Sequence, residues 1–231
     1  MNLIIEDGWI YLALLVGVIS CFVLPYVKKV SNWFITIIHE FGHAITALFL
    51  GGGIQGIRLH SDGSGSTHTY QSNGILYKLV RRIILFAGYS FPIYIGLALL
   101  IVAALGKYEL GSILLVIIGI LTFVFLRNWF GFLIIFVYFG TLIAFWLMRF
   151  QVDNKYLIIF MGFLFLIGGL HDIIQVSKIV FRKEVAAESD FHLLASESWF
   201  PAPVWYITFI IVQTIIISVT LLTLQISVTF Q

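Results

Sequence analysis

Long uninterrupted apolar runs constrain the fold of this chain more than any other feature of its sequence. A helix needs about 20 apolar residues to cross the hydrocarbon core of a bilayer. A helix also bonds its own backbone groups there, whereas the strands of a barrel would alternate in polarity. Seven runs reach or approach this length: 8–27, 31–50, 82–105, 111–126, 129–148, 156–180 and 204–230. We therefore predict an all-α polytopic membrane protein with six or seven transmembrane helices.

The scarcity of charge supports a membrane location. Charged residues make up 10% of the 231 residues, against about 25% in an average soluble domain. The net charge of +2 is too small to attract nucleic acid. We therefore expect the lipid bilayer as a partner and no nucleic acid. Nothing indicates a separate soluble domain, and residues 1–231 are expected to form one integral-membrane domain.

The connections between the runs carry further predictions. Arg127 and Asn128 separate the fourth run from the fifth, so these runs form either a tight helical hairpin or one broken helix. The polar segment 51–79 is rich in Gly, Ser and Thr, and 54–59 and 67–71 could be strands around a turn at SDGSGS. We predict a short β-hairpin or re-entrant segment there. A second polar segment covers 181–203.

The run at 31–50 contains the sequence HEFGH, with His39, Glu40 and His43. Residues four apart lie on one face of a helix, so both imidazoles can reach one metal ion. Zinc in such a site lowers the pKa of a water molecule to about 7, and Glu40 could take its proton. The alternative is that both histidines are core residues bonded to neighbouring helices. Because an ionisable group costs about 2.5–3.5 kcal/mol at mid-bilayer, we favour the metal site.

A catalytic zinc site takes three protein ligands, so one ligand must come from a later segment. The later candidates with suitable side chains are His171, Asp172, Asp190, His192 and Glu197. We favour Asp172, which lies inside the run at 156–180, because a carboxylate at that depth needs a partner. His192, in a segment that could fold back toward the site, is the second choice.

Two further features bear on Asp172. Gly168 and Gly169 precede it and would let another helix approach closely. Gln175 lies one turn further on and could brace the Asp172 carboxylate by a hydrogen bond without touching the metal. The alternatives are that Asp172 pairs with Arg149 or Lys155, or that it marks the membrane boundary.

The chain resembles the site-2 protease family of intramembrane zinc metallopeptidases, and more narrowly its compact bacterial branch. The motifs that carry the resemblance extend over most of the chain: HEFGH, GGGI, DGSGST, AGYSFP, RNWFG, GGLHD and SDFHLLA. The family's proline-rich stretch before its third ligand, N-P-x-P-P-L-D-G, does not occur here. The stretch GGLHDIIQ contains Asp172, which is the only aspartate inside one of the apolar runs.

The resemblance implies zinc on His39 and His43, Glu40 as the catalytic base, and Asp172 as the third ligand. It also implies that an asparagine holds substrate or oxyanion, for which Asn128 is the counterpart. The family places short strands near its active site, so the segment 51–79 could capture an extended substrate by edge pairing. An ordinary polar surface loop is the alternative for that segment.

Together these features predict a multi-pass zinc metalloendopeptidase of the bacterial plasma membrane. Its partners would be membrane-protein or membrane-associated peptide substrates, which it would hydrolyse within or beside the bilayer. Two alternatives remain at this point: a catalytically inactive zinc-binding relative, and a small membrane transporter. A transporter would be expected to repeat polar residues along several spans, which the third and fourth runs do not.

Overall fold

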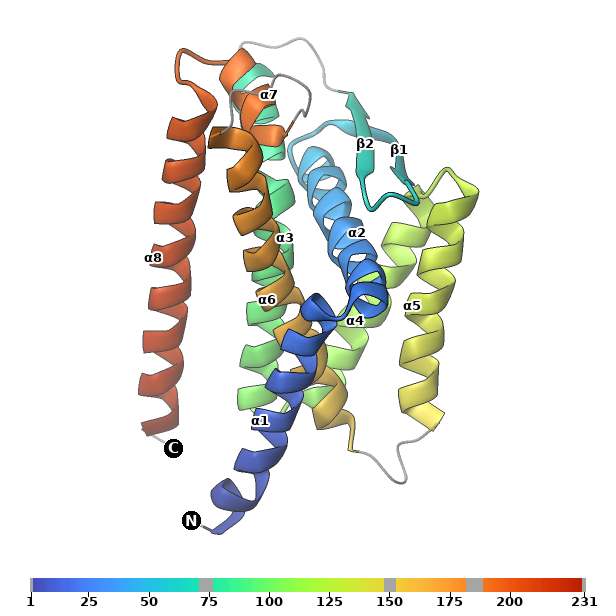
Figure 1. Ribbon diagram of the computed structural model, residues 1–231, viewed down its shortest axis with the longest axis vertical. Coiled ribbons are helices and arrows are strands. Elements are labelled where there is room, and N and C mark those ends of the chain that lie inside the picture. Colours follow the sequence, from blue (N-terminus) through green and yellow to red (C-terminus); the bar gives the residue numbers. More distant parts are fainter. Residues whose placement is uncertain (1, 71–76, 148–152, 182–188, 230–231) are drawn as a thin grey trace.

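Helices dominate the computed structural model, which describes residues 2–70, 77–147, 153–181 and 189–229. They stand side by side, with a small hairpin at one end (Figure 1). In chain order the elements are α1 (Asn2–Val23), α2 (Pro25–Phe49), β1 (Gly53–Leu59), β2 (Gly65–Tyr70), α3 (Tyr77–Ala104), α4 (Tyr108–Phe125), α5 (Trp129–Leu147), α6 (Asn154–Phe181), α7 (Asp190–Ser196) and α8 (Ala202–Thr229). The predicted all-α membrane fold with a short hairpin is confirmed.

The described residues contain five candidate spans, or six if one bent pair of helices counts as a span, which meets the predicted six or seven at six. Among the described residues, α3, α4, α5, α6 and α8 are each long and apolar enough to cross a membrane. The first two predicted runs pass this test only together, as a pair bent by 98°. The bend falls at Leu24, whose extended backbone (φ −74°, ψ 123°) is the conformation that a following proline imposes.

The fourth and fifth runs form two helices, α4 and α5, rather than one broken helix. The two lie side by side in Figure 1 and contact each other. The Tyr138 hydroxyl of α5 donates to the Leu115 carbonyl of α4 over 2.9 Å. Three predicted boundaries, Gln71, Met148 and Phe230, lie outside the described residues.

The helices α2, α3 and α6 pack closely because glycines remove side chains from their contacts. A Cβ on Gly96 of α3 would lie 2.5 Å from the backbone nitrogen of Leu166 on α6. A Cβ on Gly168 of α6 would lie 2.3 Å from Ile35 on α2. Small residues allow this close approach in membranes, where packing holds helices together. The motif helix α2 is thereby fixed against two neighbours.

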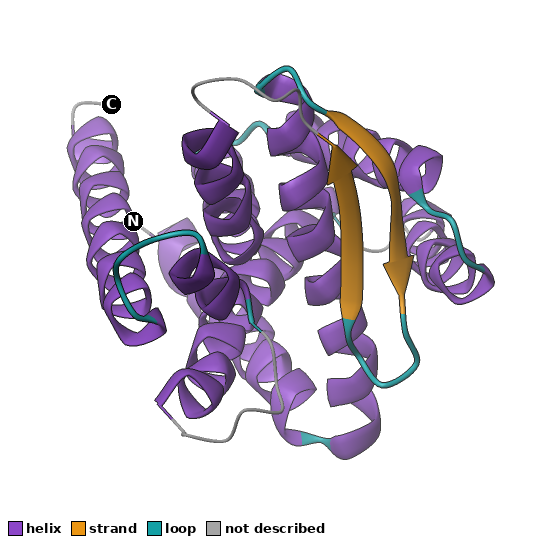
Figure 2. Cartoon of the chain, turned by 90° about the horizontal axis from the view of Figure 1, so that it is seen from above, coloured by secondary structure: helices purple, strands orange, loops and turns teal. Residues whose placement is uncertain are grey.

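The chain reverses directly after α2 to form the hairpin. Gly51 has φ +77°, the left-handed conformation that commonly ends a helix and favours glycine. The Gly52 N–H then donates to the Ala47 carbonyl over 2.8 Å. β1 and β2 pair antiparallel, with Leu59 opposite Gly65. Seen from above, the two strands lie side by side over the near end of the bundle, with helices visible on both sides of them (Figure 2).

Candidate active site

The two motif histidines meet at their ring nitrogens on the inner face of α2. Their Nε2 atoms are 3.1 Å apart, and the His43 side chain is buried. Space for both rings comes from Gly88 on α3, where a Cβ would lie 2.4 Å from Nε2 of His43 and 2.6 Å from Nε2 of His39. Any larger residue at this position would displace the pair.

A backbone carbonyl orients His43. Its Nδ1 lies 2.7 Å from the carbonyl oxygen of Ile84 on α3. Since a carbonyl only accepts, Nδ1 carries the proton and Nε2 of the neutral ring keeps a lone pair. This is how proteins fix the tautomer of a metal-ligating histidine. The edge of the His39 ring packs against Tyr89, with ring centroids 4.5 Å apart.

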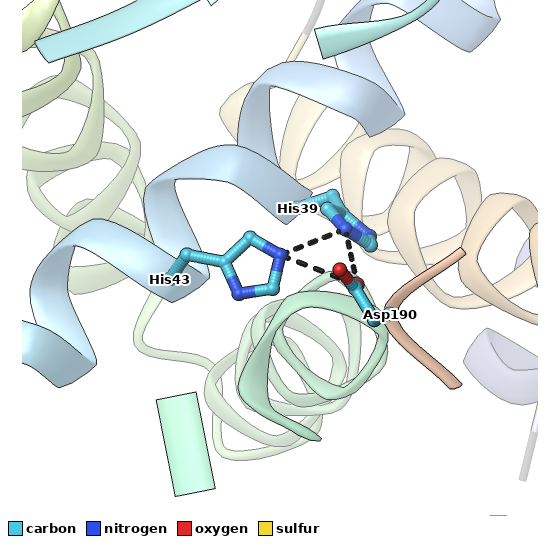
Figure 3. Close-up of side chains that lie close together, drawn as sticks. All are labelled: His39, His43 and Asp190. Carbon is cyan, nitrogen blue, oxygen red and sulfur yellow. Dashed lines mark hydrogen bonds and ion pairs between the residues drawn. The ribbon is translucent and has the colours of Figure 1, made fainter. Parts of the chain in front are cut away.

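Asp190, at the start of α7, completes a three-residue cluster (Figure 3). Its Oδ2 is 3.1 Å from Nε2 of His39 and 3.3 Å from Nε2 of His43. Apart from these two rings, this buried oxygen has no hydrogen-bond partner among the described residues. The three side chains form a group that could hold a metal ion.

The spacing of the three donor atoms fits a tetrahedral metal. Ligands at 2.0–2.2 Å from a tetrahedral zinc lie about 3.3–3.6 Å from one another, close to the 3.1–3.3 Å measured between the nitrogens and Oδ2. Asp190 would supply a carboxylate oxygen, a usual zinc ligand beside two histidines.

The predicted third ligand, Asp172, is not in this cluster. It lines the same cavity from α6, whereas Asp190 has its oxygen at the two histidines. From sequence, Asp172 was favoured for its depth, while Asp190 lies in the polar segment 181–203. In the structure, Phe191 and Leu194 are buried and draw α7 onto the helices. The signal was present in SDFHLLA: a possible N-cap serine followed by apolar residues three apart predicts a short amphipathic helix.

Two other predicted partners have different contacts. Gln175 donates to Nε2 of His171 over 3.1 Å and accepts from Lys178 over 3.0 Å. Neither of these two contacts is with Asp172. The Nδ1 of His192 lies 2.8 Å from the Ser189 hydroxyl, and His192 is not in the cluster.

Glu40 is buried beside the histidines and contacts the hairpin. The Thr67 hydroxyl of β2 lies 2.7 Å from Oε2 of Glu40 and donates to it. Gly65, two residues earlier on the same strand, allows this approach, because a Cβ there would lie 2.7 Å from Oε1. The strand β2 therefore packs directly against the carboxylate that the motif offers as a base.

Asn128, predicted to hold substrate or oxyanion, instead bonds to β1. Its Oδ1 accepts from the Leu59 N–H over 3.1 Å and its Nδ2 donates to the Leu59 carbonyl over 2.6 Å. The next residue back, Arg127, donates its N–H to the Ile57 carbonyl over 2.9 Å. The connection between α4 and α5 thus covers the outer edge of β1.

Among the described residues, no strand pairs with the opposite edge of the hairpin. Because Ile57 and Leu59 bond outward, their cross-strand partners Thr67 and Gly65 also direct their backbone groups away from the ladder. Among the described residues, β1 is the only strand that pairs with β2. This free edge borders a cavity of about 910 Å³ that also contains the histidines, Glu40 and Asp172.

Comparison with known proteins places these features in one family. No curated protein and no solved structure matches the chain. A family model described as Peptidase M50B-like matches residues 10–220. The matched region contains the HEFGH helix, the hairpin and α7. The chain therefore belongs to the Peptidase M50B-like family, within the site-2 protease family that its motifs resemble.

Proposed function

We propose that the protein is a zinc-dependent intramembrane endopeptidase that hydrolyses peptide bonds of membrane-associated substrates. His39, His43 and Asp190 would be the zinc ligands and Glu40 the general base. The observation that carries the proposal is the triangle of donor atoms 3.1–3.3 Å apart beside a buried carboxylate, in a polar cavity among apolar helices. The bacterial plasma membrane, expected from the family resemblance, remains a prediction.

In the proposed reaction, the metal and Glu40 would have different roles. Zinc in this cluster would supply Lewis acidity, polarising the scissile carbonyl and making a water molecule more acidic. Glu40 would take one proton from the attacking water while the water oxygen bonds to the carbonyl carbon. It would then return that proton to the nitrogen as the C–N bond breaks. One water is consumed, and a carboxyl and an amine are formed.

The hairpin supports a specific mode of substrate binding. An extended segment could add to the free edge of β2, where main-chain hydrogen bonds give affinity without a fixed sequence. Thr67 and Gly65 face Glu40, so a segment paired there would pass beside the base. A helical substrate would first have to unwind locally, because its carbonyls are bonded within the helix.

The test needs no known substrate. The purified protein in detergent would be incubated with a solubilised membrane fraction, and new protein N-termini would be identified by mass spectrometry. We expect termini that appear with the wild type and fall by at least about 100-fold with Glu40→Gln, which is isosteric but cannot take the proton. Glu109→Gln, an exposed position on α4, is the matched control and should behave as wild type.

Metal content decides the other half of the proposal. We expect about one zinc per wild-type chain, retained in Glu40→Gln and lost in His39→Ala with His43→Ala. Wild-type protein with zinc but without new termini would identify an inactive zinc-binding relative. Full zinc retention in the double histidine variant would rule out the metal site.

A further inference from the structure

The element that carries the third ligand is too short to hold its own position. α7 has seven residues, and isolated helices of that length are not stable in water. Yet Asp190 must meet two histidines that α2 holds firmly. The contacts that anchor α7 to the rest of the molecule therefore decide how well the three ligands are preorganised.

A pair of arginines on α3 holds the C-terminal end of α7. Arg82 donates from its Nη2 to the main-chain carbonyl of Glu197, the residue that follows α7. The neighbouring Arg81 places its Nε 3.1 Å from the Glu197 carboxylate and donates from Nη1 to the Tyr77 hydroxyl over 3.0 Å. Both the backbone and the side chain of Glu197 are thus bound to one turn of α3.

The same helix holds the other end of α7. The ring of Phe191, next to Asp190, stacks on Tyr89 of α3 with centroids 5.1 Å apart and planes 6° apart. Ile84, between the arginines and Tyr89, orients His43. α3 therefore contacts both elements that supply metal ligands, over little more than two turns.

Arg82 is poorly explained by fold stability alone. Its Nε is buried and has no hydrogen-bond partner among the described residues. A buried charge with incomplete partners costs free energy, and an apolar side chain of similar size is often neutral or stabilising in its place. The contact of Arg82 with Glu197 explains this residue better than a contribution to the stability of the fold.

We propose that Arg82, assisted by Arg81, is a positioning residue for the third metal ligand. By fixing Glu197 it holds α7 against α3, so that Asp190 is at the two histidines before the metal binds. This inference rests on the proposed metal site. Preorganisation of this kind lowers the entropy that binding must overcome, and removing an outer partner of a metal ligand commonly weakens affinity about 10–100-fold.

Charge removal and loss of positioning would change the zinc affinity in opposite directions, so one substitution distinguishes them. Arg82→Met removes a positive charge near a cation site, which by Coulomb's law alone would strengthen zinc binding. Positioning predicts the opposite: a zinc dissociation constant raised about tenfold, measured by competition with a chromophoric chelator in detergent. The melting temperature of the metal-free protein should be unchanged or higher.

Matched variants separate the causes. Lys78→Met removes the same charge from an exposed position on the first turn of α3 and should leave zinc affinity unchanged or slightly higher. Arg82→Lys keeps a donor and should recover most of the affinity. If Arg82→Met does not fold, Arg81→Met supplies the measurement, with a smaller loss expected because that ion pair is partly exposed.

The results for these variants distinguish the positioning role from the zinc site itself. Wild-type affinity in Arg82→Met, or an equal loss in Lys78→Met, would overturn the positioning role while leaving the zinc site intact. A metal-free Arg82→Met protein that melts well below wild type would make Arg82 a structural residue. Wild-type protein without zinc would instead sink the proposed function, on which this role depends.

Discussion

At the scale of single residues, two aspartates are candidates for the third ligand of the proposed metal site. Asp190 has an oxygen 3.1 and 3.3 Å from the histidine nitrogens, whereas Asp172 only lines the cavity. We predict that Asp190→Asn weakens zinc binding by about 100-fold or more, beyond a typical outer partner. Asp172→Asn should retain zinc. Chelator competition on both variants measures the difference, and the reverse order would restore Asp172 as the ligand.

The motif pair was predictable from sequence and its third partner was not, for a physical reason. His39 and His43 are four residues apart, so helix geometry alone brings them together. Asp190 is about 150 residues further on, and its place depends on the burial of Phe191 and Leu194 against other elements. The free-energy cost of a carboxylate inside the bilayer favoured Asp172, but the depth of a residue does not determine its distance from the histidines.

Thr67 was not singled out from sequence, yet it is the side chain that contacts the proposed base. Its hydroxyl lies 2.7 Å from Oε2 of Glu40. We predict that Thr67→Val, which keeps the shape but loses the donor, lowers kcat about tenfold, the value of one hydrogen bond to a charged group. Zinc content should be unchanged.

Thr67→Ser provides the rescue, since it keeps the hydroxyl. Kinetics on the best-cleaved peptide from the wild-type digest would compare the three proteins. A Thr67→Ser enzyme as slow as Thr67→Val would mean that the hydroxyl alone does not restore the rate, which would contradict the assigned role of the hydrogen bond to Glu40. A change in KM alone would mean that Thr67 acts on the substrate and not on Glu40.

At the scale of elements, the hairpin was predictable because its signals are local. Glycines mark the turn and the reversal after α2, and the residues between them favour strands. The cover on the outer edge of β1 was not predictable, because Asn128 and Leu59 are 69 residues apart. The motif RNWFG contains Asn128, but the sequence does not indicate that this asparagine bonds to the backbone of a strand.

The contact between Asn128 and β1 can be tested directly. Asn128→Asp replaces the donor to the Leu59 carbonyl with an oxygen that repels it. We predict amide hydrogen exchange in β1 about tenfold faster, the loss of roughly one hydrogen bond, with zinc content unchanged. Asn154→Asp, the same change at the start of α6, is the control. Unaltered exchange in Asn128→Asp would show that the Asn128 contact does not hold β1.

At the scale of the whole molecule, apolar run length predicted the bundle but not the exact number of spans. Each long run became a helix, as hydropathy requires in lipid. Whether the first two runs are separate spans depends on the bend of 98° at Leu24 and Pro25, and hydropathy does not report bends. The walls of the polar cavity come from five separated segments, and run length does not show which segments meet.

The last prediction concerns where water reaches within this bundle. Thr36 of α2 lines the cavity, whereas Ile215 of α8 is 57% exposed on a helix apolar enough to face lipid. In a Cys21→Ser background, which removes the only cysteine, each position would be changed to cysteine. A charged, water-soluble thiol reagent attacks the thiolate, which forms in water and not in hydrocarbon. In intact membranes we therefore expect labelling of Thr36→Cys and none of Ile215→Cys, although the second is the more exposed side chain. Labelling only at Ile215 would mean that α8 lies outside the bilayer and that the cavity is closed to water, which would leave Glu40 without the water molecule that its proposed role requires.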